Sequence, residues 1–93
     1  MEVEYLEKLA EFFKVFGDRT RLNILKLLSE NELNVTEISE KLDMNNSAIS
    51  HQLRVLRAAN LVKTRKDGKE VFYMLSDDHV KKIYEVGMEH MME

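Results

Sequence analysis

Four side chains of the types that bind metal ions stand in a regular pattern late in the 93-residue chain. An Asp-x-His string is followed, after ten residues, by a His-x-x-Glu string, and the donors are Asp77, His79, His90 and Glu93. Imidazole nitrogens and carboxylate oxygens are both ligands for zinc in tetrahedral sites. The chain has no Cys, so thiolate metal sites, disulfides and a cysteine nucleophile are excluded.

One predicted helix must position these donors. Apolar residues between the two strings recur at helical spacing and predict a helix over residues 78–92, with N-cap candidates at 76–78. His79 and His90 are eleven residues apart, so they share a face but lie about 16 Å apart along the helix axis. Because zinc–nitrogen bonds are about 2 Å long, the two rings of one chain cannot bind the same ion.

Two antiparallel copies of this helix around a two-fold axis would form two identical sites. Each site would combine Asp77 and His79 of one chain with His90 and Glu93 of its partner. The alternative reading is that all four are polar surface residues at the ends of a helix. We favour the metal, because the four donors form complete sites only under dimer symmetry. Zinc is the expected ion, and Co²⁺ or Ni²⁺ remain alternatives because affinities follow the Irving–Williams order.

Basic side chains are concentrated in the middle of the chain. The composition is 44% hydrophobic and 33% charged with a net charge of −3, but residues 41–70 carry seven basic side chains against three acidic ones. An acidic protein can bind a polyanion through such a segment. The sequence lacks a transmembrane stretch and a signal-peptide pattern, so we expect one domain over residues 1–93, located in the cytoplasm and without a membrane partner.

Hydrophobic spacing and turn signals predict the elements that carry these charges. Before the last helix, helices are expected over 4–15, 20–29, 36–42 and 47–59, and strands over 61–65 and 70–75. Gly17 is expected to end the first helix and Asp18 to cap the second. Asp67-Gly68 between the strands is a hairpin signal. The order ααααββα predicts a mainly α fold with a small β-hairpin, a winged helix-turn-helix.

The aromatic-rich first helix and the Met-rich last helix offer more apolar surface than so small a core needs. We therefore expect a homodimer formed through these two helices.

The helix predicted at 47–59 has two different faces. Ile49, Leu53 and Leu56 fall in one narrow sector, which suits a core, whereas the opposite side is polar at its start and cationic further on. That face suits the major groove of DNA, and the hairpin cations would lie beside phosphates or the minor groove. The alternative is an ordinary solvated face. The candidate DNA contacts are Asn46, Ser47, Ser50, His51, Arg54, Arg65, Lys66 and Lys69.

No catalytic constellation accompanies these residues in the sequence. Ser50 and His51 are neighbours on one helix, with no third member of a triad. We therefore expect a protein that is not an enzyme.

Taken together, these strings resemble the ArsR/SmtB family of metal-responsive winged-helix repressors. The resemblance covers nearly the whole chain, and besides the terminal donors its carriers are Asp18-Arg19-Thr20-Arg21-Leu22, Ser47-Ala48-Ile49-Ser50-His51-Gln52-Leu53 and Asp67-Gly68-Lys69. It implies that the apo dimer binds a double-stranded operator and that zinc weakens this binding. It also implies that Asp77, His79, His90 and Glu93 are the ligands. A ligand histidine would then hydrogen-bond toward the residue closing the recognition helix, here Asn60.

The resemblance also limits the metals that are expected. Asn34 and Thr36 stand where soft-metal sensors of the family carry two thiolates, so arsenite, cadmium and lead sensing there is not expected. Two other functions stay open: a repressor of the same family that answers a signal other than a metal, and a winged helix that binds a protein.

Overall fold

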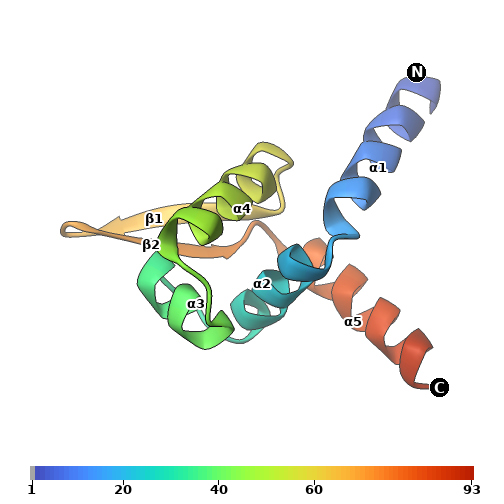
Figure 1. Cartoon of the computed structure of the whole chain (residues 1–93). Coiled ribbons are helices and arrows are strands. Elements are labelled where there is room, and N and C mark those ends of the chain that lie inside the picture. The colour runs from blue at the N-terminus through green and yellow to red at the C-terminus, as the bar shows by residue number, and fades with distance from the viewer. Residues whose placement is uncertain (1) are drawn as a thin grey trace.

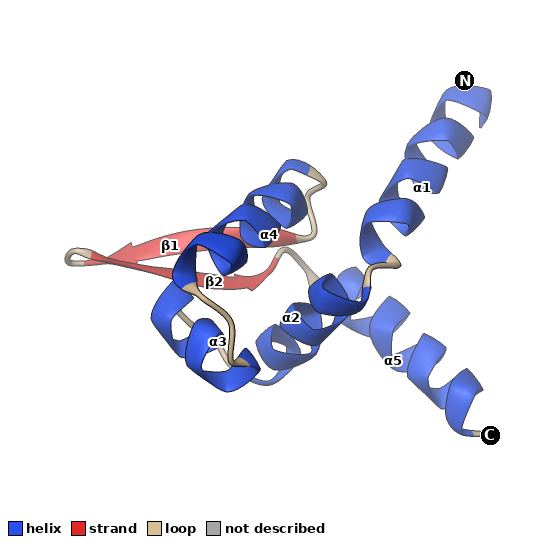
Figure 2. Ribbon diagram, viewed as in Figure 1, coloured by secondary structure: helices blue, strands red, loops and turns tan. Residues whose placement is uncertain are grey.

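Residues 2–93, which the computed structural model describes, form five helices and one two-stranded antiparallel hairpin. The elements are α1 (Glu2–Phe16), α2 (Arg19–Glu30), α3 (Val35–Leu42), α4 (Asn46–Ala58), β1 (Val62–Asp67), β2 (Glu70–Leu75) and α5 (Asp78–Met92). The hairpin leaves the body of the molecule on one side, and α1 and α5 leave it on the other (Figure 1). The predicted winged helix-turn-helix is confirmed (Figure 2).

Polar side chains fix the starts of the three central helices. The Asp18 carboxylate accepts a hydrogen bond from the backbone of α2 at 3.0 Å, and Asn45 does the same for α4 at 2.8 Å. Asn34 and Glu37 form a reciprocal capping box at α3. A capping side chain bonds the second or third residue beyond it, so the helix begins directly after the cap. Each of the three helices therefore begins one residue earlier than the spacing of apolar residues predicted.

Left-handed residues end α3 and α4 but not α1. Asp43 has a φ of 53° and Asn60 a φ of 63°, whereas Gly17 is not among the positive-φ residues of the described chain. The Gly17 N–H instead donates to the carbonyl of Phe13 at 2.9 Å, and the extended Asp18 begins α2 at once. The prediction that Gly17 ends α1 is therefore confirmed, but without the left-handed conformation typical of that position.

The hairpin turn is tighter than the sequence suggested. Asp67 pairs with Glu70, so β1 extends to Asp67 and only Gly68 and Lys69 form the turn. Gly68 has a φ of +63°, which the first central position of a two-residue hairpin turn requires. This arrangement places Lys69, within the turn, and Lys66, on β1 just before Asp67, at the tip of the β1–β2 hairpin, which is the wing of the fold.

The core lies where the three central helices meet the base of the hairpin. The predicted apolar sector of α4 is confirmed, since Ile49, Leu53 and Leu56 are fully buried. They pack with Ile24 and Leu25 of α2, among others. Burial of such side chains contributes about 2 kcal/mol each, so α4 is held to the body through one face.

Arg21 joins three helices, a contact that the sequence did not predict. From α2, its Nε donates to the Val15 carbonyl near the end of α1 at 2.7 Å, and its Nη1 donates to Gln52 Oε1 on α4 at 3.2 Å. A guanidinium can hold two such partners because its donors lie in a fixed plane. Arg21 thus fixes α4 relative to α1. Within residues 2–93, no helix combines the length and apolar character needed to cross a membrane.

Ser39 on α3 carries a buried hydroxyl that has no hydrogen-bond partner in the described structure. Replacing Ser39 with Ala removes an unsatisfied polar group, so we expect the free energy of unfolding to rise by about 1 kcal/mol. Urea unfolding at one fixed protein concentration measures it.

The control is Ser29→Ala, since the Ser29 hydroxyl bonds the Lys26 carbonyl at 2.6 Å and is exposed. This variant should change the unfolding free energy by less than about 0.5 kcal/mol. A loss of stability in Ser39→Ala at unchanged m-value would show that the hydroxyl has a bonding partner after all.

Candidate DNA interface and metal donor pairs

Helix α4 is the second helix of the helix-turn-helix, the recognition helix, and it exposes the face predicted to contact DNA. Asn46, Ser47, His51 and Arg54 are exposed, and Ser50 is half-buried beside them. They stand opposite the buried apolar sector, which anchors α4 to the body. A short turn at residues 43–45 separates α3 from α4. This surface is polar at its start and cationic further along, as a helix that reads a major groove requires.

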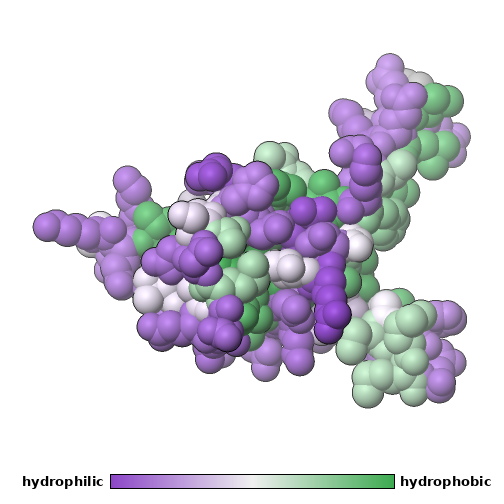
Figure 3. All heavy atoms as spheres, viewed as in Figure 1, coloured by the Kyte–Doolittle hydropathy of each residue, from purple (hydrophilic) through white to green (hydrophobic). Residues whose placement is uncertain are grey.

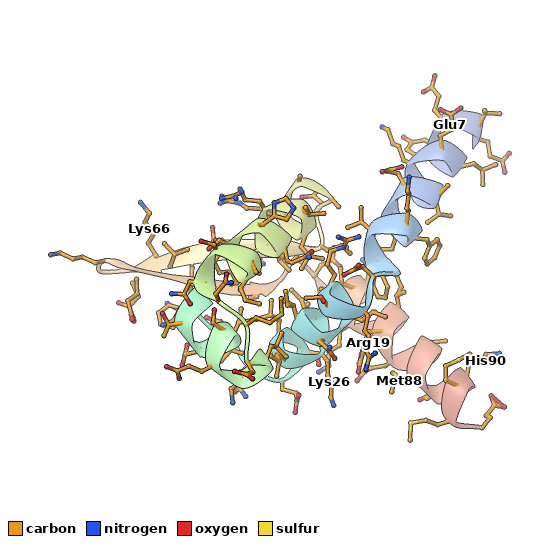
Figure 4. The ribbon with its side chains drawn as sticks, in the orientation of Figure 1. Glu7, Arg19, Lys26, Lys66, Met88 and His90 are labelled. Carbon is orange, nitrogen blue, oxygen red and sulfur yellow. The ribbon has the colours of Figure 1, made fainter. Side chains whose placement is uncertain are left out.

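The wing carries cations that differ in their surroundings. Lys66 and Lys69 are exposed, and within residues 2–93 neither forms an ion pair. Figure 4 shows Lys66 reaching away from the hairpin at the far end of the molecule from α5. These two charges are available to phosphates.

Arg65 is held in place by two neighbours. Its Nε donates to Glu32 Oε1, and its guanidinium carbon lies 4.9 Å from the centre of the Phe72 ring. The hydrogen bond to Glu32 raises the pKa of Arg65 above its ordinary value. Glu32 lies 33 residues away in the sequence, so no local pattern could have indicated this pair.

The donors at the start of α5 lie side by side. Asp77 has extended backbone, with φ −163° and ψ 178°, and its Oδ1 accepts hydrogen bonds from the backbone N–H groups of His79 and Val80. The same oxygen lies 3.5 Å from His79 Nδ1. On a tetrahedral ion with bonds of about 2.1 Å, two donor atoms lie about 3.4 Å apart. Asp77 and His79 therefore lie close to the spacing of two ligands on one ion.

The donors at the end of α5 form a second pair. His90 Nδ1 lies 3.8 Å from Glu93 Oε2, and both side chains are about three-quarters exposed. The pair stands at the opposite end of the helix from Asp77, and Figure 4 shows His90 directed outward there. Within residues 2–93 of one chain, no group of three His, Asp or Glu side chains could hold a metal ion. One chain therefore supplies two donors at each end of α5.

Apolar side chains form part of the surface of the two helices that leave the body of the molecule, beside hydrophilic ones (Figure 3). A groove of about 510 Å³ lies between α2 and α5, lined in part by Leu22, Tyr84 and Met88. The large exposed hydrophobic side chains are Val3, Tyr5, Leu6, Leu9, Phe13, Val86, Met88, Met91 and Met92, all on α1 or α5. This concentration matches the expected dimer surface.

Asn60, predicted to link the metal site to α4, is the left-handed residue that follows this helix. Its carbonyl accepts a hydrogen bond from the Ser76 hydroxyl at 2.5 Å. From the sequence, Ser76 was only one of the N-cap candidates at 76–78, and no local signal indicated its contact with Asn60.

Comparison with known proteins agrees with this architecture. Residues 18–64 match the model of the arsR family of bacterial regulatory proteins. The chain is 38% identical to a transcriptional repressor SmtB homolog of Synechocystis sp., over 100% of this chain and 70% of that protein. It is 39% identical to a cadmium resistance regulatory protein CadC homolog of Staphylococcus aureus, over 90% and 70%. The transcriptional activator HlyU of Vibrio cholerae is 42% identical, over 85% and 73%.

Solved structures of winged helix-turn-helix proteins share the fold. A homodimeric winged helix-turn-helix DNA-binding domain from Mycobacterium bovis superposes with a TM-score of 0.93 at 26% identity, over 99% of this chain and 85% of that one. The family match covers residues 18–64, and sequence identity and fold extend the likeness over nearly the whole chain. The chain therefore belongs to the ArsR/SmtB family of winged helix-turn-helix, DNA-binding transcriptional regulators.

Proposed function

We propose that this protein is a zinc-responsive repressor that binds its operator as an apo homodimer and releases it when zinc binds between the subunits. The observation that carries the proposal is the pair of two-donor groups on α5. The donor atoms lie 3.5 Å apart in the first group, near the spacing on a tetrahedral ion, and 3.8 Å apart in the second, which must close slightly. Within residues 2–93 each group lacks the further ligands that such an ion needs.

The dimer supplies the missing ligands. In an antiparallel pairing of α5 with its copy, Asp77 and His79 of one chain face His90 and Glu93 of the partner. The exposed apolar surface of α1 and α5 supports this pairing, as does the homodimeric relative from Mycobacterium bovis. When bound, zinc would cross-link the two α5 helices. Two nitrogens and two carboxylate oxygens match its preference, and Co²⁺ or Ni²⁺ would bind the same donor set.

The DNA contacts follow from the exposed face of α4 and from the wing. We assign base contacts to Asn46, Ser47, Ser50 and His51, and backbone contacts to Arg54 and the wing cations. Among the wing cations, Lys66 and Lys69 carry unpaired charges, whereas Arg65 shares its Nε with Glu32. As the family implies, a ligand histidine whose Nδ1 binds the metal has its second nitrogen free to donate toward Asn60.

A second candidate is a regulator of the same family that responds to a signal other than a metal. It is favoured by the incomplete donor set of the single chain, since a pair of His and Asp or Glu residues is also an ordinary ion pair at a helix end. The relative named as an activator shows in addition that the family is not limited to repressors. Metal stoichiometry separates the two candidates.

Removing a wing lysine tests the DNA assignment. Lys66→Ala and Lys69→Ala should each weaken binding to all duplexes and lower the slope of log affinity against log salt by about 0.9, the value for one phosphate contact. Fluorescence anisotropy over a salt series measures both quantities, with a duplex selected by the wild-type protein from a random pool.

The matched control is Lys26→Ala, which removes a lysine from α2 on the body of the molecule (Figure 4). It should leave the salt slope unchanged. Ser50→Ala should change the sequence preference rather than the slope, because base contacts specify and phosphate contacts position. An unchanged slope in both wing variants would show that the wing does not contact DNA.

Mixed dimers test the intersubunit metal site. Wild-type protein should bind one zinc per chain, and His79→Ala and His90→Ala homodimers should each lose tight binding at both sites. A heterodimer of the two variants should regain one tight site, because one chain keeps Asp77 and His79 and the other keeps His90 and Glu93. Titration with a chromophoric zinc chelator measures the number of tight sites.

The control is a mixed dimer of wild type and His79→Ala, which should also hold one tight site. If the heterodimer of the two variants binds no zinc tightly, the site is not shared between chains. If the wild type binds none, the metal-independent candidate is favoured.

A further inference from the structure

Ser76 stands where the recognition helix, the wing and α5 meet. It follows the last residue of β2 and precedes Asp77, the N-cap of α5. Its hydroxyl donates to the carbonyl of Asn60 at 2.5 Å, and its backbone N–H donates to the carbonyl of Leu61 at 3.1 Å. Both acceptors belong to the segment that closes α4. Ser76 thus binds the end of α4 with two donors from one residue.

The segment that Ser76 holds is itself rigidly joined to α4. The Asn60 N–H donates to the Arg57 carbonyl at 3.0 Å, and the Leu61 N–H donates to the Leu56 carbonyl at 2.9 Å. With Asn60 in the left-handed region, these two bonds form a Schellman closure of the helix. Leu61 is fully buried in the core. A displacement of this segment therefore displaces the end of α4.

The other neighbour of Ser76 is the first metal donor. The Asp77 carboxylate accepts two backbone hydrogen bonds at the start of α5, so the position of Asp77 is tied to that of the helix. Consecutive Cα atoms are about 3.8 Å apart and the peptide between them is planar, so no flexible linker separates the two residues.

We propose that Ser76 is a positioning residue that couples the Asp77–His79 donor pair to the recognition helix within one chain. The proposal rests on the proposed function, because it gives the sensing site a mechanical connection to α4. A change in the position of the Asp77 carboxylate moves Ser76, and the two hydrogen bonds of Ser76 move Asn60 and Leu61. This connection runs through the backbone and a serine hydroxyl, and it is separate from the histidine contact toward Asn60 proposed above.

The serine side chain and backbone can be tested separately. Ser76→Ala removes the bond to Asn60 and keeps the backbone bond to Leu61, whereas Ser76→Thr keeps a hydroxyl at the same atom. Ser29→Ala is the matched control, because the Ser29 hydroxyl bonds a carbonyl within its own helix. Thermal melts of all variants check that each one folds.

The first experiment measures duplex binding with and without zinc, using the duplex that the wild-type protein selects from a random pool. The quantity measured is the ratio of duplex Kd values with and without saturating zinc. Ser76→Ala should lower this ratio at least fivefold while its zinc Kd, measured without DNA, stays within threefold of wild type. Ser76→Thr and Ser29→Ala should keep the wild-type ratio. A wild-type ratio in Ser76→Ala would overturn the proposal.

A metal-free experiment separates this inference from the zinc proposal. Asp77→Ala removes the capping carboxylate of α5, and it should shift the backbone amide NMR resonances of Asn60 and Leu61 in the wild-type background. In the Ser76→Ala background, which keeps the backbone bond to Leu61, the same substitution should shift the Asn60 resonance less than half as much. If zinc leaves duplex binding by wild type unchanged, the proposed zinc-sensing function is wrong. The metal-free NMR comparison then still decides whether Ser76 couples the start of α5 to α4. Equal Asn60 shifts in both backgrounds would overturn the inference.

Discussion

The stiffness of α5 is the constraint on which the proposed mechanism depends. A helix of 15 residues spans about 22 Å, so the donors at its two ends cannot approach a common ion. Each end holds two donors of suitable type and spacing, and the remaining ligands must come from another molecule. The same helix exposes apolar surface that needs a partner. Metal binding and dimerisation are therefore parts of one proposal, since a single chain cannot complete either.

The wing, to which we assign DNA contacts, and the end of α5, which carries a proposed metal donor, lie on opposite sides of the molecule, so the proposed signal passes through its body. Figure 4 shows this separation, with Lys66 on the wing and His90 near the end of α5. Two polar contacts cross the intervening region. Arg21 connects the end of α1 to Gln52 on α4, and Ser76 connects the start of α5 to the segment closing α4. The buried face of α4 ensures that such displacements move it as a unit.

Much of this arrangement could be predicted from the sequence, because its signals are local. The order of elements, the caps at Asp18 and Asp77 and the buried sector of α4 all follow from spacing along a few turns. What could not be predicted depends on residues far apart in the chain. The Arg65–Glu32 pair and the Arg21–Gln52 contact join positions more than 30 residues apart. The hairpin at Asp67-Gly68 was predicted, but the extension of β1 to Asp67 was not, since strand pairing decides how far a strand runs.

In the proposed mechanism, zinc binding and operator binding to one dimer weaken each other, and thermodynamic linkage offers the most direct test. If zinc weakens operator binding by some factor, bound operator must weaken zinc binding by the same factor. The decisive measurement is the zinc Kd of the protein alone and of its complex with the selected duplex, at one salt concentration. The account predicts a weaker zinc Kd in the complex, by a factor equal to the zinc-induced loss of duplex affinity. Equal zinc affinities with and without duplex would contradict it.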